Sequence, residues 1–334
     1  MAPKLSIHLG GSTRATSGLT PGNLQFAAQL GVTHIVTSDE AGEMIPKHNG
    51  FWAVEDLVAV RERVEAGGLT LAAIENFPAD HWDRILLGAD GREEQLENLG
   101  RTITNMGKAG IPCMGYCFSL TGAFGRAETV ARGGAPSEGF AESEGTHLLP
   151  LPVGYVWNRW VEDPGRATLP TFRTGPDGVK EHREAVDRHK AAGGEFLAPV
   201  PVEEMWERFE WFLTRLLPFA EAAGVRLAAH PNDPPLPVHR GMGCPLNTPQ
   251  AYQRLLGISD SYFNACEFCQ GTVAQMEQGG EFVQGAIREY GKRIAYVHCE
   301  CRLTLARSRP TFSYYWSAPP PDQKCPPSQR GLGC

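Results

Sequence analysis

The chain has 334 residues, of which 42% are apolar and 21% are charged, and its 31 Lys and Arg against 38 Asp and Glu give a formal net charge of −7. This apolar content is enough for a sizeable core, which excludes an intrinsically disordered chain. The mildly acidic balance argues against a nucleic-acid or anionic-membrane surface, and no apolar run reaches the roughly 18 residues of a membrane span.

Apolar runs of strand length recur along the chain. In chain order they are Lys4–Leu9, Thr33–Thr37, Leu71–Glu75, Ile111–Phe118, Arg226–His230, Tyr262–Phe268 and Arg293–Glu300. Helical patterns lie between them, at Val54–Ala66, Glu93–Ala109 and Glu203–Ala223. This alternation predicts a parallel sheet with right-handed crossovers. Because no strand is followed by a dinucleotide-binding glycine pattern, we predict an α/β fold of the (β/α)8 TIM-barrel type, missing or irregular in the eighth βα unit.

Two segments interrupt the alternation. Residues 121–200 are rich in Gly, Pro and Arg, and a helix is predicted near Val179–Ala192. This insertion leaves the carboxyl end of the fourth strand, so in a barrel it lies over the active-site mouth. The tail 303–334 is rich in proline and has neither a helical nor a strand period. We therefore expect the barrel at 1–302, followed by an irregular tail whose composition is typical of disorder or of out-of-frame translation of a GC-rich gene.

Three predicted strand ends carry side chains that bind metals. His230 ends the fifth strand, Cys269 follows the sixth, and His298 lies in the seventh. The carboxyl ends of barrel strands surround the active site, so these groups are expected to meet there. Imidazole and thiolate together suit Zn²⁺, Fe²⁺ or Mn²⁺. Cys266 has the opposite strand parity, so we place Cys269, beside a turn glycine, in the site.

Other residues near strand ends are candidates for catalysis. Glu75 ends the third strand and is a candidate acid, base or ligand; its alternative is a structural hydrogen-bond acceptor, because a carboxylate buried without a partner is costly. Tyr116 lies at the end of the fourth strand. Arg126 lies in the insertion and offers a guanidinium fork to a substrate carboxylate, with a solvated surface charge as its alternative.

The string HPNDPP, which begins at His230, resembles the HPDDPP hallmark of the mannonate dehydratase family. Further strings resemble that family in the same order, over residues 4–302: TLAAIENFP, ITNMGKAGIPCMGYCF, FLTRLLPFAEAAGVRLAAHPNDPP, FCQGT and RIAYVHCEC. The resemblance implies a xylose isomerase-like barrel that holds Mn²⁺ or Fe²⁺ through His230, Cys269, His298 and an Asp. It also implies a hydro-lyase of glucuronate catabolism, which converts D-mannonate into 2-dehydro-3-deoxy-D-gluconate. Glu75, Tyr116 and Arg126 are then candidates for substrate contact.

The sequence departs from the family pattern at several positions. Asn232 stands where the first Asp of HPDDPP is expected, and Cys117 replaces the Asn of a Tyr-Asn-Phe string. No counterpart of the Asp ligand is found after Arg302. If the tail belongs to the chain, the barrel is open on one side and one metal ligand is missing.

Three alternatives stay open at this stage. The first is a metal-dependent sugar isomerase or epimerase on a xylose isomerase-like barrel, and the second is an inactive, truncated barrel that only binds a ligand or a metal. The third is a structural zinc site on the CxxC and CxC pairs, Cys266, Cys269, Cys299 and Cys301. The amino terminus lacks a secretion pattern, so we expect a cytoplasmic protein with thiols rather than disulfides. The expected partner is a sugar acid, without nucleic acid or membrane, and a homo-oligomer is compatible with the sequence.

Overall fold

A computed structural model describes residues 4–10, 18–39, 42, 44–122, 126–130, 136–163, 172–173, 178–277, 279–299 and 312–314. The strands of its main sheet are β1 (Ser6–His8), β2 (His34–Ser38), β3 (Thr70–Glu75), β4 (Cys113–Tyr116), β10 (Arg226–Ala229), β13 (Asn264–Cys269) and β14 (Ile294–His298). The helices around this sheet are α1 (Pro21–Gln29), α2 (Val54–Ala66), α3 (Asp83–Leu87), α4 (Arg92–Lys108), α6 (Val202–Ala223), α7 (Pro249–Gly257), α8 (Gln270–Gln275) and α9 (Gly279–Tyr290).

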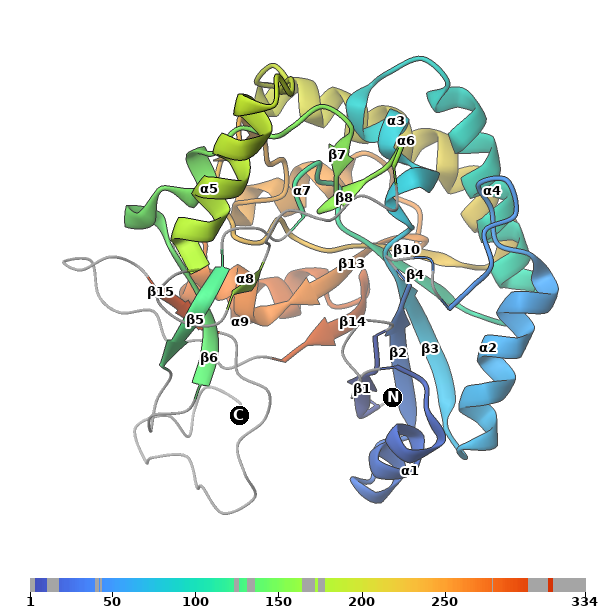
Figure 1. The fold of residues 1–334 in the computed structure, drawn as a ribbon. Coiled ribbons are helices and arrows are strands. Elements are labelled where there is room, and N and C mark those ends of the chain that lie inside the picture. The colour runs from blue at the N-terminus through green and yellow to red at the C-terminus, as the bar shows by residue number, and fades with distance from the viewer. Residues whose placement is uncertain are drawn as a thin grey trace.

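The seven strands form one parallel sheet that curls into most of a barrel (Figure 1). Their order is β1-β2-β3-β4-β10-β13-β14, which is also their order along the chain. Strands β1 and β14 are the two edges, and their carboxyl ends approach each other, since the rings of His8 and His298 lie 6.4 Å apart. The prediction of a TIM-type barrel that is irregular at its eighth unit is confirmed for the described residues.

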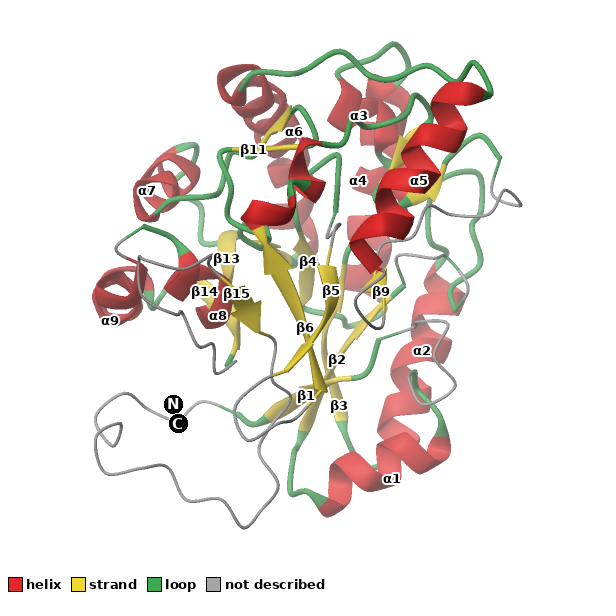
Figure 2. Cartoon of the chain, turned by 60° about the vertical axis from the view of Figure 1, so that its left-hand side comes forward, coloured by secondary structure: helices red, strands yellow, loops and turns green. Residues whose placement is uncertain are grey.

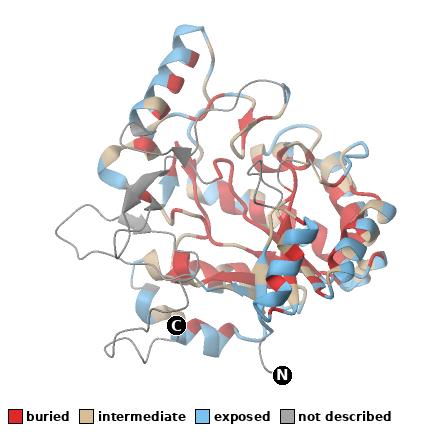
Figure 3. Ribbon diagram, turned by 60° about the horizontal axis from the view of Figure 1, so that its bottom comes forward, coloured by how far each residue is buried: buried red, intermediate tan, exposed pale blue. Residues whose placement is uncertain are grey.

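The helices cover the outer face of the sheet because each has one apolar face. Helices α1 and α2 lie beside β2 and β3, while α7 and α9 lie on the side of β13 and β14 (Figure 2). Helix α4 buries Leu99, Ile103 and Met106, the apolar positions spaced by three and four residues. Buried residues accordingly concentrate in the strands and on the inner faces of the helices (Figure 3).

The segment between β4 and α6 forms a separate layer. It contains β5 (Arg126–Val130), β6 (Pro136–Ala141), β7 (Tyr155–Val156), β8 (Arg159–Trp160), β9 (Phe172–Arg173), α5 (Gly178–Ala191) and the short 3-10 turns η3 (Glu142–Glu144) and η4 (Thr146–Leu148). Strands β5, β6 and β9 join β15 (Phe312–Tyr314) in a four-stranded sheet. The tail was predicted to lack strand structure; its three described residues form a strand, and its other residues lie outside the described part.

Two short strands, β11 (Val238–His239) and β12 (Met242–Gly243), pair in the loop that follows β10. A 3-10 turn, η1 (Ala79–His81), follows β3. Within the described ranges, no helix is long and apolar enough to cross a lipid bilayer.

The buried side chain of His81 is expected to make the stability of the protein depend on pH. Its side chain is buried in the core beside the Trp52 ring, at 6.2 Å between ring centroids, and burial lowers the pKa of His81 to about 4. Below pH 6.5 the unfolded chain therefore binds more protons than the folded chain, so the free energy of unfolding falls as the pH falls toward 4. Between pH 7 and pH 5 we expect wild type to lose about 2 kcal/mol more than His81→Leu, measured by urea unfolding. Equal losses in the two proteins would contradict this assignment.

Candidate metal centre

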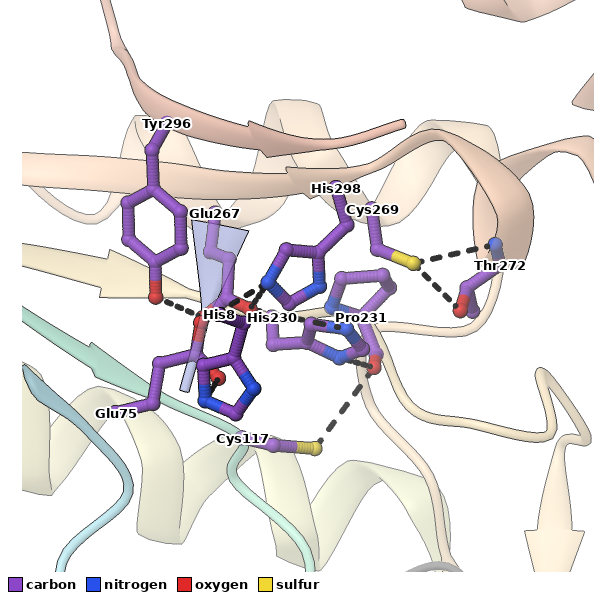
Figure 4. Close-up of polar contacts among 10 residues, drawn as sticks. All are labelled: His8, Glu75, Cys117, His230, Pro231, Glu267, Cys269, Thr272, Tyr296 and His298. Carbon is purple, nitrogen blue, oxygen red and sulfur yellow. Dashed lines mark hydrogen bonds and ion pairs between the residues drawn. The ribbon is translucent and has the colours of Figure 1, made fainter. Parts of the chain in front are cut away.

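The three side chains predicted as metal ligands meet at the carboxyl ends of adjacent strands (Figure 4). One ligand atom from each of His230, Cys269 and His298 lies within 4.8 Å of the others. His230 follows β10, Cys269 ends β13 and His298 ends β14. Cys269 and His298 are also direct partners in the register of β13 and β14. The parallel sheet therefore brings together residues that are separated by up to 68 positions in the sequence.

Local hydrogen bonds orient the side chains of His230 and Cys269. The Nδ1–H of His230 donates to the Pro231 carbonyl at 2.6 Å, which leaves Nε2 facing the cluster. The Cys269 sulfur accepts a hydrogen bond from the Thr272 backbone N–H at 3.4 Å and lies 3.1 Å from the Thr272 hydroxyl, with which it also shares a hydrogen bond. The bond from the backbone N–H favours a negatively charged sulfur, the form that binds metals.

Two buried carboxylates complete the cluster. Glu75 Oε1 accepts a hydrogen bond from His298 Nε2 at 2.9 Å, and Glu75 Oε2 lies 3.5 Å from His8 Nε2. Glu267 Oε1 lies 3.3 Å from His298 Nε2, and Glu267 Oε2 accepts a 2.6 Å hydrogen bond from the Tyr296 hydroxyl. Glu75, Glu267 and His298 form a second group of ligand atoms within 4.8 Å of one another.

The pKa values of the two imidazoles are set by their acidic neighbours. Burial alone would lower the pKa of His298, but Glu267, Cys269 and Glu75 outweigh it and raise that pKa to about 11. The pKa of His230 is raised well above its ordinary value, against burial, by Glu267 and by Cys117 and Cys269. Acidic neighbours that hold protons on two imidazoles also favour a metal ion there, so the donor set fits a divalent cation of borderline softness.

The two carboxylates have opposite shifts. Burial raises the pKa of Glu267 to about 8, and the negative charge of Glu75 adds to this shift, while His230 and His298 oppose it. Burial also acts to raise the pKa of Glu75, but the positive charges of His8 and His298 and the hydrogen bond from His298 lower it to about 2. Glu75 is therefore ionised at neutral pH.

A cavity of about 140 Å³ lies over the cluster. Its lining residues are Glu75, Asn76, Cys117, Ser119, Gly122, Trp157, His230, Asp233, Glu267 and His298. Gly122 and Trp157 come from the predicted insertion, which therefore contributes to the wall of the cavity. Trp157 has a φ of 51°, a conformation that is unusual for a bulky residue and is found most often where a site requires it.

Of the predicted catalytic residues, Glu75 lines this cavity and Tyr116 does not. Tyr116 is fully buried on the outer face of β4, where its ring packs against Phe209 and Phe212 of α6. Side chains alternate along a strand, so Cys117 takes the inward position and Tyr116 belongs to the core. Arg126 begins β5, but its side chain lies outside the described residues, so its role stays a prediction.

The proposed zinc site on four cysteines is not supported by the described residues. Cys266 packs in the core, where burial raises its pKa to about 12, while Cys269 faces the cluster. Cys299 is exposed, and Cys301 lies outside the described residues. The six described cysteines form no disulfide with one another.

Sequence reasoning missed three residues of the cluster. Glu267 lies two positions before Cys269 and shares its strand face, so the parity argument that selected Cys269 also predicts an inward Glu267. Tyr296 has the same relation to His298 in β14. His8 ends the first strand, a position that in a barrel points to the active site.

Asn232, one of the departures from the family pattern, has a structural explanation. Its Oδ1 accepts a 2.8 Å hydrogen bond from the Leu246 N–H, and its Nδ2 donates to the Phe118 carbonyl at 3.3 Å. A carboxylate at this buried position could not donate to that carbonyl. The amide therefore ties the loop after β10 to the segment that leaves β4.

Gly115 lies where the inner side chains meet, and because glycine has no side chain it leaves space for them. A Cβ at this position would overlap the Tyr296 hydroxyl and lie 2.7 Å from Glu267 Oε2 and 3.0 Å from Glu75 Cγ. We expect Gly115→Ala to lower the free energy of unfolding by about 1–3 kcal/mol, through overpacking. Gly285→Ala is the control, since a Cβ on this exposed helical glycine meets nothing within 4 Å and alanine there should stabilise α9 by about 0.5–1 kcal/mol. Urea unfolding compares the two, and equal effects would contradict the crowding at Gly115.

Fold and site together place the chain among (β/α) barrels that carry a cluster of metal-binding side chains at their strand ends. A family model described as D-mannonate dehydratase (UxuA) matches residues 18–310. The chain therefore belongs to the D-mannonate dehydratase family, whose members are hydro-lyases.

Individual relatives agree with this assignment. The chain is 29% identical over 252 residues to the mannonate dehydratase of Streptococcus equi subsp. zooepidemicus, covering 74% of this chain and 62% of the relative. It is 30% identical over 274 residues to the mannonate dehydratase of Enterococcus faecalis, covering 80% and 70%. The crystal structure of mannonate dehydratase from Streptococcus suis serotype 2 matches with a TM-score of 0.65 at 24% identity, covering 94% of this chain and 76% of that one. The chain thus spans about three fifths of the length of the first relative, and the structural match supports the fold.

Proposed function

We propose that this chain is a divalent-metal-dependent dehydratase that converts D-mannonate into 2-dehydro-3-deoxy-D-gluconate, in cytoplasmic hexuronate catabolism. The observation that carries the proposal is the convergence of His230, Cys269 and His298 within 4.8 Å, next to two buried carboxylates. Membership of the D-mannonate dehydratase family supports the choice of substrate. The proposed metal is Mn²⁺ or Fe²⁺, both of which accept imidazole and carboxylate ligands.

The proposed reaction removes one water. The C2–H and C3–O bonds break, a C2=C3 double bond forms, and the resulting enol rearranges to the 2-keto product. A bound divalent cation would polarise the substrate carboxylate and hydroxyl oxygens and so acidify the C2 proton. His230, Cys269 and His298 would hold that cation at the base of the cavity.

Glu75 is the proposed proton-transfer group. It is buried at the cavity wall, ionised at neutral pH, and in contact with His8, which is 3.5 Å away. An ionised carboxylate can accept the C2 proton. The low exposure of Glu75 keeps competing water away from the carboxylate.

The test is incubation of the Mn²⁺-loaded or Fe²⁺-loaded protein with D-mannonate. We expect a 2-keto-3-deoxy acid, detected by the periodate–thiobarbiturate colour reaction, and a mass decrease of one water. A product of unchanged mass would instead indicate an isomerase or epimerase. Unchanged D-mannonate, with metal bound, would indicate a barrel that binds ligands without catalysis. Either result overturns the proposal.

A further inference from the structure

The three proposed ligands leave the coordination of a metal incomplete. Tetrahedral sites take four ligands, and larger coordination shells take more. In such a site, donor atoms bonded at about 2.1 Å lie roughly 3.4 Å from one another. A further protein ligand should therefore place its donor atom at about this distance from the ligand nitrogens already identified.

Glu267 Oε1 meets this condition. It lies 3.3 Å from His298 Nε2 and 3.9 Å from His230 Nε2. The Glu267 carboxylate therefore lies within 4.0 Å of both imidazoles, whereas the Glu75 carboxylate forms its ion pairs with His298 and His8. We infer that Glu267 supplies the carboxylate ligand of the metal at His230, Cys269 and His298, an inference that rests on the function proposed above.

Glu75 is the alternative carboxylate, but its geometry differs. Its Oε1 contacts His298 at 2.9 Å, and its Oε2 lies 3.5 Å from His8, which belongs to β1. Glu267 instead shares one strand and one strand face with Cys269, two residues further on. The strand that carries the thiol thus also carries the carboxylate between the two imidazoles.

Tyr296 holds Glu267 in this position. The register of β13 and β14 pairs Glu267 with Tyr296 and Cys269 with His298, so these four side chains form a two-by-two block on the inner face of the sheet. The Tyr296 hydroxyl donates to Glu267 Oε2 at 2.6 Å, which leaves Oε1 turned toward the imidazoles. Partners of this kind orient metal-binding carboxylates, so Tyr296 is a positioning residue.

The experiment separates ligation from charge. Chelator-stripped wild type, Glu267→Asp, Glu75→Asp and Tyr296→Phe are titrated with Mn²⁺, and the dissociation constant is obtained from the electron paramagnetic resonance signal of free Mn²⁺. Both Asp variants keep a carboxyl group, but each withdraws its oxygens by one methylene. We expect the Mn²⁺ dissociation constant to rise at least about 10-fold in Glu267→Asp and less than about 3-fold in Glu75→Asp.

Two further measurements test the inference independently of the Mn²⁺ affinity of Glu267→Asp. Tyr296→Phe keeps both carboxylates and should weaken Mn²⁺ binding by about 10-fold, so it tests the inference even if Glu267→Asp fails to fold. The visible absorption of the Co²⁺-loaded protein reports the ligand set directly, and should change in Glu267→Asp but not in Glu75→Asp. Circular dichroism confirms that each variant is folded.

Equal Mn²⁺ affinities of the two Asp variants, with unchanged Co²⁺ spectra, would overturn the role of Glu267 and leave the proposed function intact. In the opposite case the wild type binds Mn²⁺ but leaves D-mannonate unchanged, while Glu267→Asp and Tyr296→Phe show the predicted losses of Mn²⁺ affinity. That result would support the Glu267 ligand and overturn the proposed function. A wild type that binds neither Mn²⁺ nor Co²⁺ would overturn both.

Discussion

Replacing Cys269 with alanine is expected to raise the Mn²⁺ dissociation constant more than about 100-fold and to bring D-mannonate dehydration below detection. The Cys269 sulfur is buried, forms two hydrogen bonds with Thr272 and lies within 4.8 Å of the His230 and His298 ligand atoms. Alanine offers no donor atom, so the remaining imidazoles would have to hold the cation without the negatively charged sulfur. The measurement is elemental analysis of metal per chain after desalting, together with the rate of product formation.

Cys266→Ala is the matched control for this variant. Cys266 lies in the same strand and is equally buried, but it packs in the core away from the cluster. Its loss should cost about 1–2 kcal/mol of stability through a small cavity, while one metal per chain is retained. Full metal occupancy in Cys269→Ala, or equal metal loss in both variants, would contradict the assignment of Cys269 as a ligand.

Glu75→Gln is expected to lower kcat for D-mannonate by about 10²–10⁴-fold at saturating metal, with a smaller change in KM. The amide has nearly the same shape as the carboxylate but cannot accept a proton. Because Glu75 is ionised and lines the cavity, the loss should fall on the chemical step rather than on substrate binding. The measurement is steady-state kinetics with the colour assay for the 2-keto-3-deoxy product.

Tyr116→Phe provides the contrast to Glu75→Gln. The sequence predicted both residues as substrate contacts, but the structure buries Tyr116 on the outer face of β4. We therefore expect Tyr116→Phe to keep kcat within about 2-fold of wild type, since only a hydroxyl in the helical layer is removed. A wild-type kcat in Glu75→Gln would refute the proton-transfer role, and a large loss in Tyr116→Phe would refute the observed orientation of β4.

The strands and the three proposed ligands were predictable because their signals are local and repeated. Apolar runs mark the seven strands, and the barrel rule places His230, Cys269 and His298 at one end without knowledge of any distance. The orientation of Tyr116 could not be predicted because the apolar run Ile111–Phe118 is longer than β4, Cys113–Tyr116, so the run did not fix which residues face inward. Structure was needed to show that Gly115 and Cys117 take the inner positions.

The contact between Glu267 and Tyr296 could not be predicted from the sequence, for a different reason. A glutamate inside an apolar run gives no sign of whether it is paired, and its partner Tyr296 lies 29 residues away on the next strand. The contact depends on the register between β13 and β14, which includes an irregularity next to Glu267. The pairing of β15 with β6 is equally non-local, since it joins Phe312 with Ala141. Such contacts follow from tertiary packing rather than from periodicity.

The proposed function requires one metal, held by His230, Cys269 and His298, for the dehydration of D-mannonate. The most direct measurement is the rate of 2-keto-3-deoxy acid formation while Mn²⁺ is added stepwise to metal-free protein. We expect a rate that is near zero without metal, rises in proportion to Mn²⁺ and becomes constant at one equivalent per chain. A rate that is independent of added metal, or one bound equivalent with D-mannonate unchanged, would contradict it.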